Sequence, residues 1–216
     1  MVVALAVVGL VLVLIWKHHF VSAVVGVVTA AAATVSTQLL KSTLVKPNYG
    51  VQEAVLNSAP SGHTTLAAAA GAAIFLAAPR SLRPAVAVLG SLATCLTGMA
   101  TMINNWHRPG DVVSAIFVTA FWTVIGLRYF RRSEFRGGKR TIGSVIVPLL
   151  TIATLFLGFC SVVLYLIVSV SSLPGGVFVA STSMVLAVGT GCAAALIGLL
   201  RPRNRPRPAY TKVWSY

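Results

Sequence analysis

Long apolar stretches separated by short polar breaks run along the whole chain. Hydropathy and helix-breaking residues together predict seven helices. The longer stretches approach the roughly 20 apolar residues that a helix needs to cross a hydrocarbon core about 30 Å thick. The pattern therefore predicts an all-α fold, a polytopic transmembrane helical bundle. The expected helices cover residues 2–16, 20–40, 62–79, 84–104, 110–127, 142–168 and 176–200.

The breaks between these stretches divide the chain into five segments. Val2 to Trp16 resembles a signal-peptide core, but it lacks a cationic lead-in and a convincing cleavage site, so we interpret it as a short first span. The predicted segments are a first helix with a cytoplasmic turn (1–19), a four-helix membrane core (20–127), a basic cytoplasmic loop (128–141), two additional membrane helices (142–200) and a basic, Pro-rich cytoplasmic tail (201–216).

The composition supports a membrane protein and argues against nucleic acid as a partner. Hydrophobic residues make up 57% of the chain and charged residues 9%, whereas soluble domains are about a quarter charged. The net charge is +14. Most Lys and Arg residues lie directly beside apolar segments, where they set topology and contact anionic lipid headgroups, and they are not interleaved with stacking aromatics. We therefore expect membrane lipids as partners and no nucleic acid.

The distribution of Lys and Arg predicts the orientation of the chain. If the 128–141 loop faces the cytoplasm, fourteen cationic residues lie inside and three, Lys41, Lys46 and Arg108, lie outside. The loops 41–61, 105–110 and 169–175 then lie on the outer face. We therefore expect a multi-pass protein of the plasma membrane, with its unusual polar residues gathered on the outer side.

Pro60, Ser61, Gly62 and His63 stand at the predicted start of the third helix. The unpaired N–H groups and the positive dipole end of a helix favour an anion, so a phosphate could rest there. A purely structural interpretation is equally compatible with these four residues. Ser61 would then be an N-cap, Gly62 a turn residue and His63 a hydrogen-bonding partner of a neighbouring carbonyl.

His107, Arg108, Pro109, Gly110 and Asp111 open the fifth predicted helix. A carboxylate at this spacing can reach back to the imidazole, fix its tautomer and support the positive charge that forms when the other ring nitrogen attacks. A histidine nucleophile needs such a partner. Alternatively, the acid stabilises the helix start and the histidine sits at the membrane interface.

Together, the two motifs resemble the second and third signature motifs of the type 2 phosphatidic acid phosphatases, and Lys41 resembles the start of the first. The resemblance covers roughly residues 20 to 127, in the family's motif order. It implies that His107 attacks phosphorus, that Asp111 orients it and that His63 protonates the leaving oxygen. Lys41, Ser61 and Gly62 would bind the phosphate. The resemblance implies no metal and no other cofactor.

The chain departs from the family motifs at two arginine positions. Asn48-Tyr49 stands where the family has Arg-Pro after Lys41, and Ala100-Thr101 stands where it has Ser-Arg ahead of the nucleophile. Lys46 and Arg108 are our candidate replacements, although lysine does not reproduce the bidentate fork of arginine.

The leading interpretation is a lipid phosphatase with an outward-facing site, acting on phosphatidic acid, a phosphatidylglycerophosphate or a polyprenyl phosphate or diphosphate. Two alternatives remain open. Without the two arginines, the pocket could bind an anionic headgroup without turnover. A small transporter is the other, although the middles of the predicted spans contain no charge. The sequence does not indicate an oligomeric partner.

Overall fold

The structure is a computed structural model that describes residues 20–43, 59–131, 141–171 and 173–200. These residues form six helices, which confirms the all-α prediction for this part of the chain. The expected helix 2–16, most of the 128–141 loop and the 201–216 tail lie outside the described residues. The helices are α2 (Phe20–Thr43), α3 (Gly62–Ala77), α4 (Arg83–Ile103), α5 (Pro109–Arg131), α6 (Thr141–Val170) and α7 (Gly176–Leu199).

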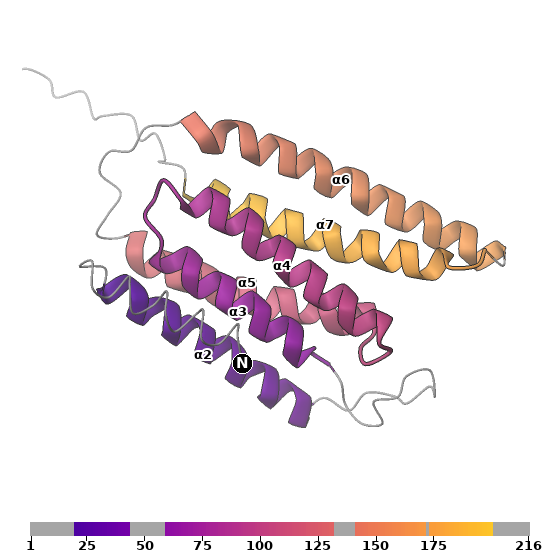
Figure 1. Ribbon diagram of the computed structural model, residues 1–216, viewed down its shortest axis with the longest axis horizontal. Helices are drawn as coiled ribbons and strands as arrows, with labels where there is room; N and C mark the ends of the chain where they lie inside the picture. Colours follow the sequence, from indigo (N-terminus) through magenta and orange to yellow (C-terminus); the bar gives the residue numbers. More distant parts are fainter. Residues whose placement is uncertain (1–19, 44–58, 132–140, 172, 201–216) are drawn as a thin grey trace, which may run out of the picture.

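The six helices lie side by side, and the chain reverses direction from each helix to the next (Figure 1). α3 packs against α2, α4 and α5, so it forms the centre of one half of the bundle. α7 packs against α4, α5 and α6, whereas α6 packs mainly on α7. Five of the helices are long and apolar enough to cross a membrane, so by helix composition the chain is a multi-pass membrane protein.

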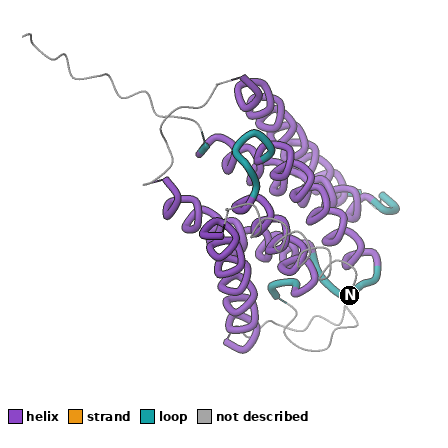
Figure 2. Tube along the Cα trace, turned by 60° about the vertical axis from the view of Figure 1, so that its left-hand side comes forward, coloured by secondary structure: helices purple, strands orange, loops and turns teal. Residues whose placement is uncertain are grey.

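Antiparallel connection brings the loops expected on the outer face to the same end of the bundle. The last turn of α2, the start of α3, the α4–α5 turn and the α6–α7 turn all lie at one end (Figures 1 and 2). The α3–α4 turn, with Arg80 and Arg83, lies at the other end together with the end of α5. We call the first the site end and the second the basic end.

Small residues allow the helices of this bundle to approach closely. A Cβ atom added to Gly26 of α2 would lie 2.8 Å from the carbonyl oxygen of Ala73 in α3, and one added to Gly71 of α3 would lie 3.3 Å from Cα of Gly90 in α4. Close backbone approach of this kind drives helix association where the hydrophobic effect is absent. Cys95 is buried in the bundle, whereas Cys160 and Cys192 are only partly buried.

The helix α3 is shorter than predicted, because it ends at Ala77 and not at residue 79. Ala78 precedes a proline and has extended backbone angles, as residues before proline usually do. The buried side chain of Arg83 then binds carbonyl groups at this end: its Nε donates to the carbonyl of Ala78 at 3.0 Å and its Nη2 to that of Leu76 at 3.2 Å. A cation is well placed there, since helix carbonyl ends carry partial negative charge.

Two other helices are longer than predicted at the ends where polar residues begin. α2 continues through Lys41 to Thr43, so the prediction that Lys41 lies in a loop was wrong. The hydroxyl groups of Ser42 and Thr43 each donate to the carbonyl of Leu39, and a cation in the last turn complements the helix dipole. α5 likewise continues past residue 127 to Arg131, because arginine is a good helix former.

Candidate active site

Ser61 is the N-cap of α3, as the structural interpretation of this motif predicted. Its Oγ accepts hydrogen bonds from the backbone N–H of Thr64 at 3.4 Å and from the Thr64 hydroxyl at 2.9 Å. Its own N–H donates to the backbone carbonyl of Asp111 at 2.8 Å. Ser61 is completely buried. Its polar groups therefore hold the start of α3 against the start of α5, and the N–H groups of the next two residues remain as the helix donors nearest the bundle end.

Lys41 lies over the start of α3, although the two segments are far apart in the chain. Its Nζ atom is 3.4 Å from the position that a Cβ atom on Gly62 would occupy. The last turn of α2 and the first turn of α3 therefore bring an ammonium group and the positive end of a helix dipole to one place. Both features attract an anion.

A tight turn between α4 and α5 positions His107. Asn105 has a φ of 56°, a left-handed conformation that asparagine tolerates better than most residues. The backbone N–H groups of Trp106 and His107 both donate to the carbonyl of Thr101, at 3.0 and 3.3 Å. The turn is thus fixed by the last part of α4, and the imidazole is presented at the start of α5.

Asp111 faces the imidazole of His107 from the first turn of α5. Its carboxylate is buried, and Oδ2 lies 3.6 Å from Nδ1 of His107 and accepts the backbone N–H of Arg108 at 3.0 Å. The first distance is that of an ion pair and is longer than a hydrogen bond. One carboxylate therefore serves both predicted roles, since it caps the helix start and can stabilise positive charge on the ring.

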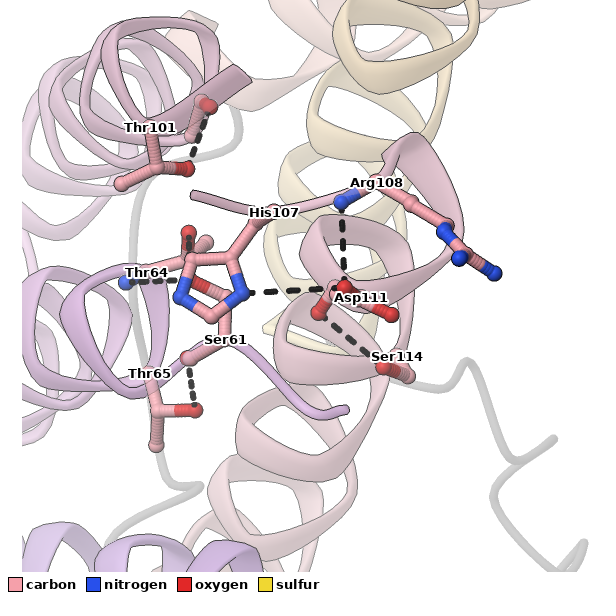
Figure 3. Close-up of polar contacts among 9 residues, drawn as sticks. Ser61, Thr64, Thr65, Thr101, His107, Arg108, Asp111 and Ser114 are labelled. Carbon is pink, nitrogen blue, oxygen red and sulfur yellow. Dashed lines mark hydrogen bonds and ion pairs between the residues drawn. The ribbon is translucent and has the colours of Figure 1, made fainter. Parts of the chain in front are cut away.

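The imidazole of His107 lies between Asp111 on one side and the first turn of α3, with Ser61 and Thr64, on the other (Figure 3). Because Nδ1 faces the carboxylate, Nε2 is the nitrogen left for chemistry on the α3 side. The Nδ1 atom of His107 is buried, and it has no hydrogen-bond partner among the described residues. A small movement of the ring would bring Nδ1 and the carboxylate of Asp111 to hydrogen-bonding distance. Such contacts commonly shorten in active sites when a substrate binds.

His63 lies beside the same turn. Its ring is 5.5 Å from that of Trp106, centroid to centroid, with an angle of 35° between the planes. His63 is exposed, as is half of the Trp106 side chain. The structure thus brings His63, His107, Asp111 and Lys41 together at the site end. A solvent-accessible histidine next to a buried histidine–aspartate pair is an arrangement that can donate and accept protons.

The structure describes only one of the two predicted replacements for the motif arginines. Lys46 lies outside the described residues. Arg108 is adjacent to the nucleophile in sequence, but its guanidinium extends away from the imidazole of His107 (Figure 3). Thr101, which stands at the position of the second arginine, is buried, and its hydroxyl donates to the carbonyl of Gly98 at 2.7 Å. A structural hydroxyl therefore occupies that position in this chain.

Residues 34–135 match the model of the PAP2 superfamily. This segment is a PAP2 superfamily domain. The PAP2 domain includes every candidate site residue, and it extends from the second half of α2 to just beyond α5. Members of the PAP2 superfamily are generally phosphatases. No curated protein and no solved structure matches the chain at a significant level.

The PAP2 domain contains several further residues that sequence reasoning did not single out. Thr37, Thr64 and Thr65 are buried around Ser61, and the carbonyl of Thr101 holds the turn that carries His107. Threonine in an apolar helix gives little signal, because it is compatible with lipid-facing and buried positions alike. In the described part of the PAP2 domain and of the helices after it, no group of three or more His, Cys, Asp or Glu residues could hold a metal ion.

Proposed function

We propose that the protein is a metal-independent phosphatase of the plasma membrane that hydrolyses a phosphomonoester or diphosphate of a lipid through a phosphohistidine intermediate. The observation that carries the proposal is the buried carboxylate of Asp111 against Nδ1 of His107, directly beside the capped start of α3. The PAP2 domain supports phosphoryl chemistry, and the roles proposed below for the site residues are compatible with this geometry.

Phosphate binding requires positive charge and N–H donors arranged around one point. The ammonium of Lys41 and the backbone N–H groups of Gly62 and His63 meet at the start of α3. Such preorganised donors stabilise the charge that spreads over the equatorial oxygens during phosphoryl transfer, and phosphoryl transfer depends mainly on this stabilisation and on positioning. Lys46 remains a proposed further ligand, and Arg108 would need to change its rotamer to become one.

The chemistry then follows in two steps. Nε2 of His107 attacks phosphorus and the P–O bond to the lipid breaks, while His63 donates a proton to the leaving oxygen. Asp111 stabilises the positive charge that develops on the ring of His107. In the second step, water attacks the phosphohistidine, His63 accepts the proton of that water, and the P–N bond breaks to release inorganic phosphate.

A lipid is the proposed substrate because the site lies where the membrane helices end. The half-exposed Trp106 stands at the entrance, and tryptophan prefers the boundary between lipid and water. Because Lys and Arg are concentrated at the basic end, we expect the site end on the outer face. Phosphatidic acid, a phosphatidylglycerophosphate and a polyprenyl phosphate or diphosphate all present a phosphate at this level with their chains in the bilayer.

The test is release of inorganic phosphate from these lipids by purified protein in detergent, with EDTA present throughout. We expect release from at least one class, and we expect the His107→Ala variant to release none above background. Thr151→Val, an exposed change on α6, is the matched control for expression and folding. A labelled, acid-labile phosphoenzyme should accumulate in the His63→Ala variant if the second step also depends on His63.

One observation favours a second candidate function, binding of an anionic headgroup without turnover. The position of the second motif arginine is occupied by the buried Thr101, so a phosphate clamp of the family is missing. If no lipid yields phosphate, and the wild type and His107→Ala bind anionic vesicles equally, this second function replaces the first.

A further inference from the structure

Buried hydroxyl groups connect three helices beneath the candidate phosphate site. Thr37 of α2 and Thr65 of α3 are 3.0 Å apart, oxygen to oxygen, and both side chains are buried. The Thr65 hydroxyl also donates to the carbonyl of Ser61 at 2.8 Å. On the other side of the same residue, the Ser61 N–H donates to the carbonyl of Asp111 in α5. The contacts therefore run from α2 through the cap of α3 to the start of α5.

The direction of these hydrogen bonds follows from the number of protons. A threonine hydroxyl has one proton to donate. Because Thr65 uses its proton on the carbonyl of Ser61, Thr37 must be the donor in the contact between the two threonines. Each hydroxyl in this series of hydrogen bonds thus has one definite role. Replacing Thr37 by a residue without a hydroxyl removes the hydrogen bond between α2 and α3, whereas the hydroxyl of Thr65 still donates to the carbonyl of Ser61.

Thr37 stands one helical turn before Lys41. Residues four apart lie on the same face of a helix, so the contact that fixes Thr37 against α3 also turns Lys41 toward α3. Ser36, the residue before Thr37, accepts a hydrogen bond from Nε1 of Trp122 in α5 at 3.0 Å. Two side-chain hydrogen bonds thus hold this turn of α2, and the Nζ atom of Lys41 reaches Gly62 one turn further on.

We propose that Thr37 and Thr65 are positioning residues that set the distance between the Lys41 ammonium and the start of α3. The inference rests on the proposed function, since Lys41 matters through the phosphate that it binds. Neither threonine contacts the substrate in this account. They act by fixing the rotation and depth of α2 against α3, and an ammonium held in this way needs no reorganisation when the phosphate arrives.

The test is a double-mutant cycle between Thr37→Val and Lys41→Met, measured as kcat/KM for phosphate release. Lys41→Met alone should reduce kcat/KM by about 10²- to 10³-fold, as loss of one preorganised charge-stabilising donor does. Thr37→Val, which displaces the ammonium without removing it, should reduce kcat/KM by roughly tenfold. In the Lys41→Met background, Thr37→Val should cause almost no further loss, because interactions that act through one group are not additive. Thr37→Ser restores the hydroxyl and should restore most of the activity.

The chain offers a matched control in a second pair of threonines. Thr154 of α6 and Thr190 of α7 are 2.9 Å apart, oxygen to oxygen, and join two helices that lie outside the PAP2 domain. Thr190→Val removes a hydroxyl that contacts a threonine of the neighbouring helix and that also donates to carbonyls of its own helix, and it should lower thermal stability without changing kcat/KM. A decrease in kcat/KM for Thr190→Val equal to that for Thr37→Val would overturn the proposal, because general loosening of the bundle would then explain both.

Binding of orthovanadate, an oxyanion analogue of phosphate, separates this inference from the proposed function. If the wild type releases no phosphate but binds vanadate, and Thr37→Val weakens binding only while Lys41 is present, the positioning role stands and the phosphatase proposal fails. If Thr37→Val and Lys41→Met act additively on turnover or on vanadate affinity, the inference is wrong while the proposed function remains. It is equally wrong if the wild type neither releases phosphate nor binds vanadate.

Discussion

Replacing Asp111 by asparagine tests the central contact of the proposed mechanism. The substitution keeps the size of the side chain, and the amide oxygen can still accept the N–H of Arg108, so the start of α5 should remain capped. The negative charge 3.6 Å from Nδ1 of His107 is lost. In the opposite orientation of the amide, its N–H group would face Nδ1 in place of the oxygen and the cap on Arg108 would be lost. That N–H group would favour the tautomer of His107 that carries its proton on Nε2, and this nitrogen then cannot attack phosphorus.

The size of the effect can be worked from the distance. Two unit charges at the separation of this pair interact by about 4.6 kcal/mol at an effective dielectric constant of 20 and by about 1.2 kcal/mol in bulk water. The buried carboxylate and partly buried imidazole lie closer to the first case. Because each 1.36 kcal/mol changes a rate tenfold, we expect Asp111→Asn to lower kcat by about 10³-fold.

Single-turnover phosphate release is the assay, since it reports the chemical step without product dissociation. Ser114→Ala is the matched control: the hydroxyl of Ser114 donates to the backbone carbonyl of Asp111 at 3.0 Å and does not touch its carboxylate (Figure 3). We expect this control to retain activity within a few-fold. If Asp111→Asn, with unchanged helicity by circular dichroism, also stays within about threefold of the wild type, the charge has no part in catalysis and the proposed role of Asp111 is refuted.

Three further substitutions test other parts of the structure. Gly62→Ala places a methyl group 3.4 Å from Nζ of Lys41. KM for the lipid phosphate should therefore rise by about tenfold while thermal stability is unchanged. An unaltered KM would mean that the phosphate binds elsewhere. Thr101→Arg puts the family's arginine into a buried position, and we expect a loss of about 3 kcal/mol in the free energy of unfolding and no gain in activity; higher activity would contradict this. Arg83→Met should destabilise α3 by about 1–3 kcal/mol, measured by urea titration in mild detergent, with KM unchanged, because its two hydrogen bonds lie at the basic end.

The sequence predicted the six described helices well, because their apolar stretches are long and polar or helix-breaking residues separate them. It also predicted that the two histidine motifs meet, since alternating helix direction places their loops at the same end. Helix ends were less predictable. Lys41 was expected in a loop, yet hydroxyl-to-carbonyl bonds and the helix dipole continue α2 through it.

The polar contacts inside the bundle could not be predicted from the sequence. The bond between Ser61 and Asp111 joins backbone groups, which every residue has, so no side-chain pattern marks it. The sequence does not mark the buried threonines either. A threonine whose hydroxyl bonds its own helix has the same hydropathy as one whose hydroxyl joins two helices. The rotamer of Arg108 depends on the turn before α5, and sequence adjacency to His107 gave no information on its direction.

The shortness of α3 has a consequence for how reactants and products would separate. Its 16 residues rise about 24 Å, less than the roughly 30 Å thickness of a hydrocarbon core. Because Arg83 contacts the carboxyl end of α3 at the basic end, we expect the opposite end to lie slightly beneath the surface of the bilayer. Each methylene that stays immersed avoids a cost of about 0.8 kcal/mol. In the proposed reaction, the dephosphorylated alcohol would therefore diffuse away laterally while the inorganic ion departs into water, and the two products would partition into different phases at the moment they form.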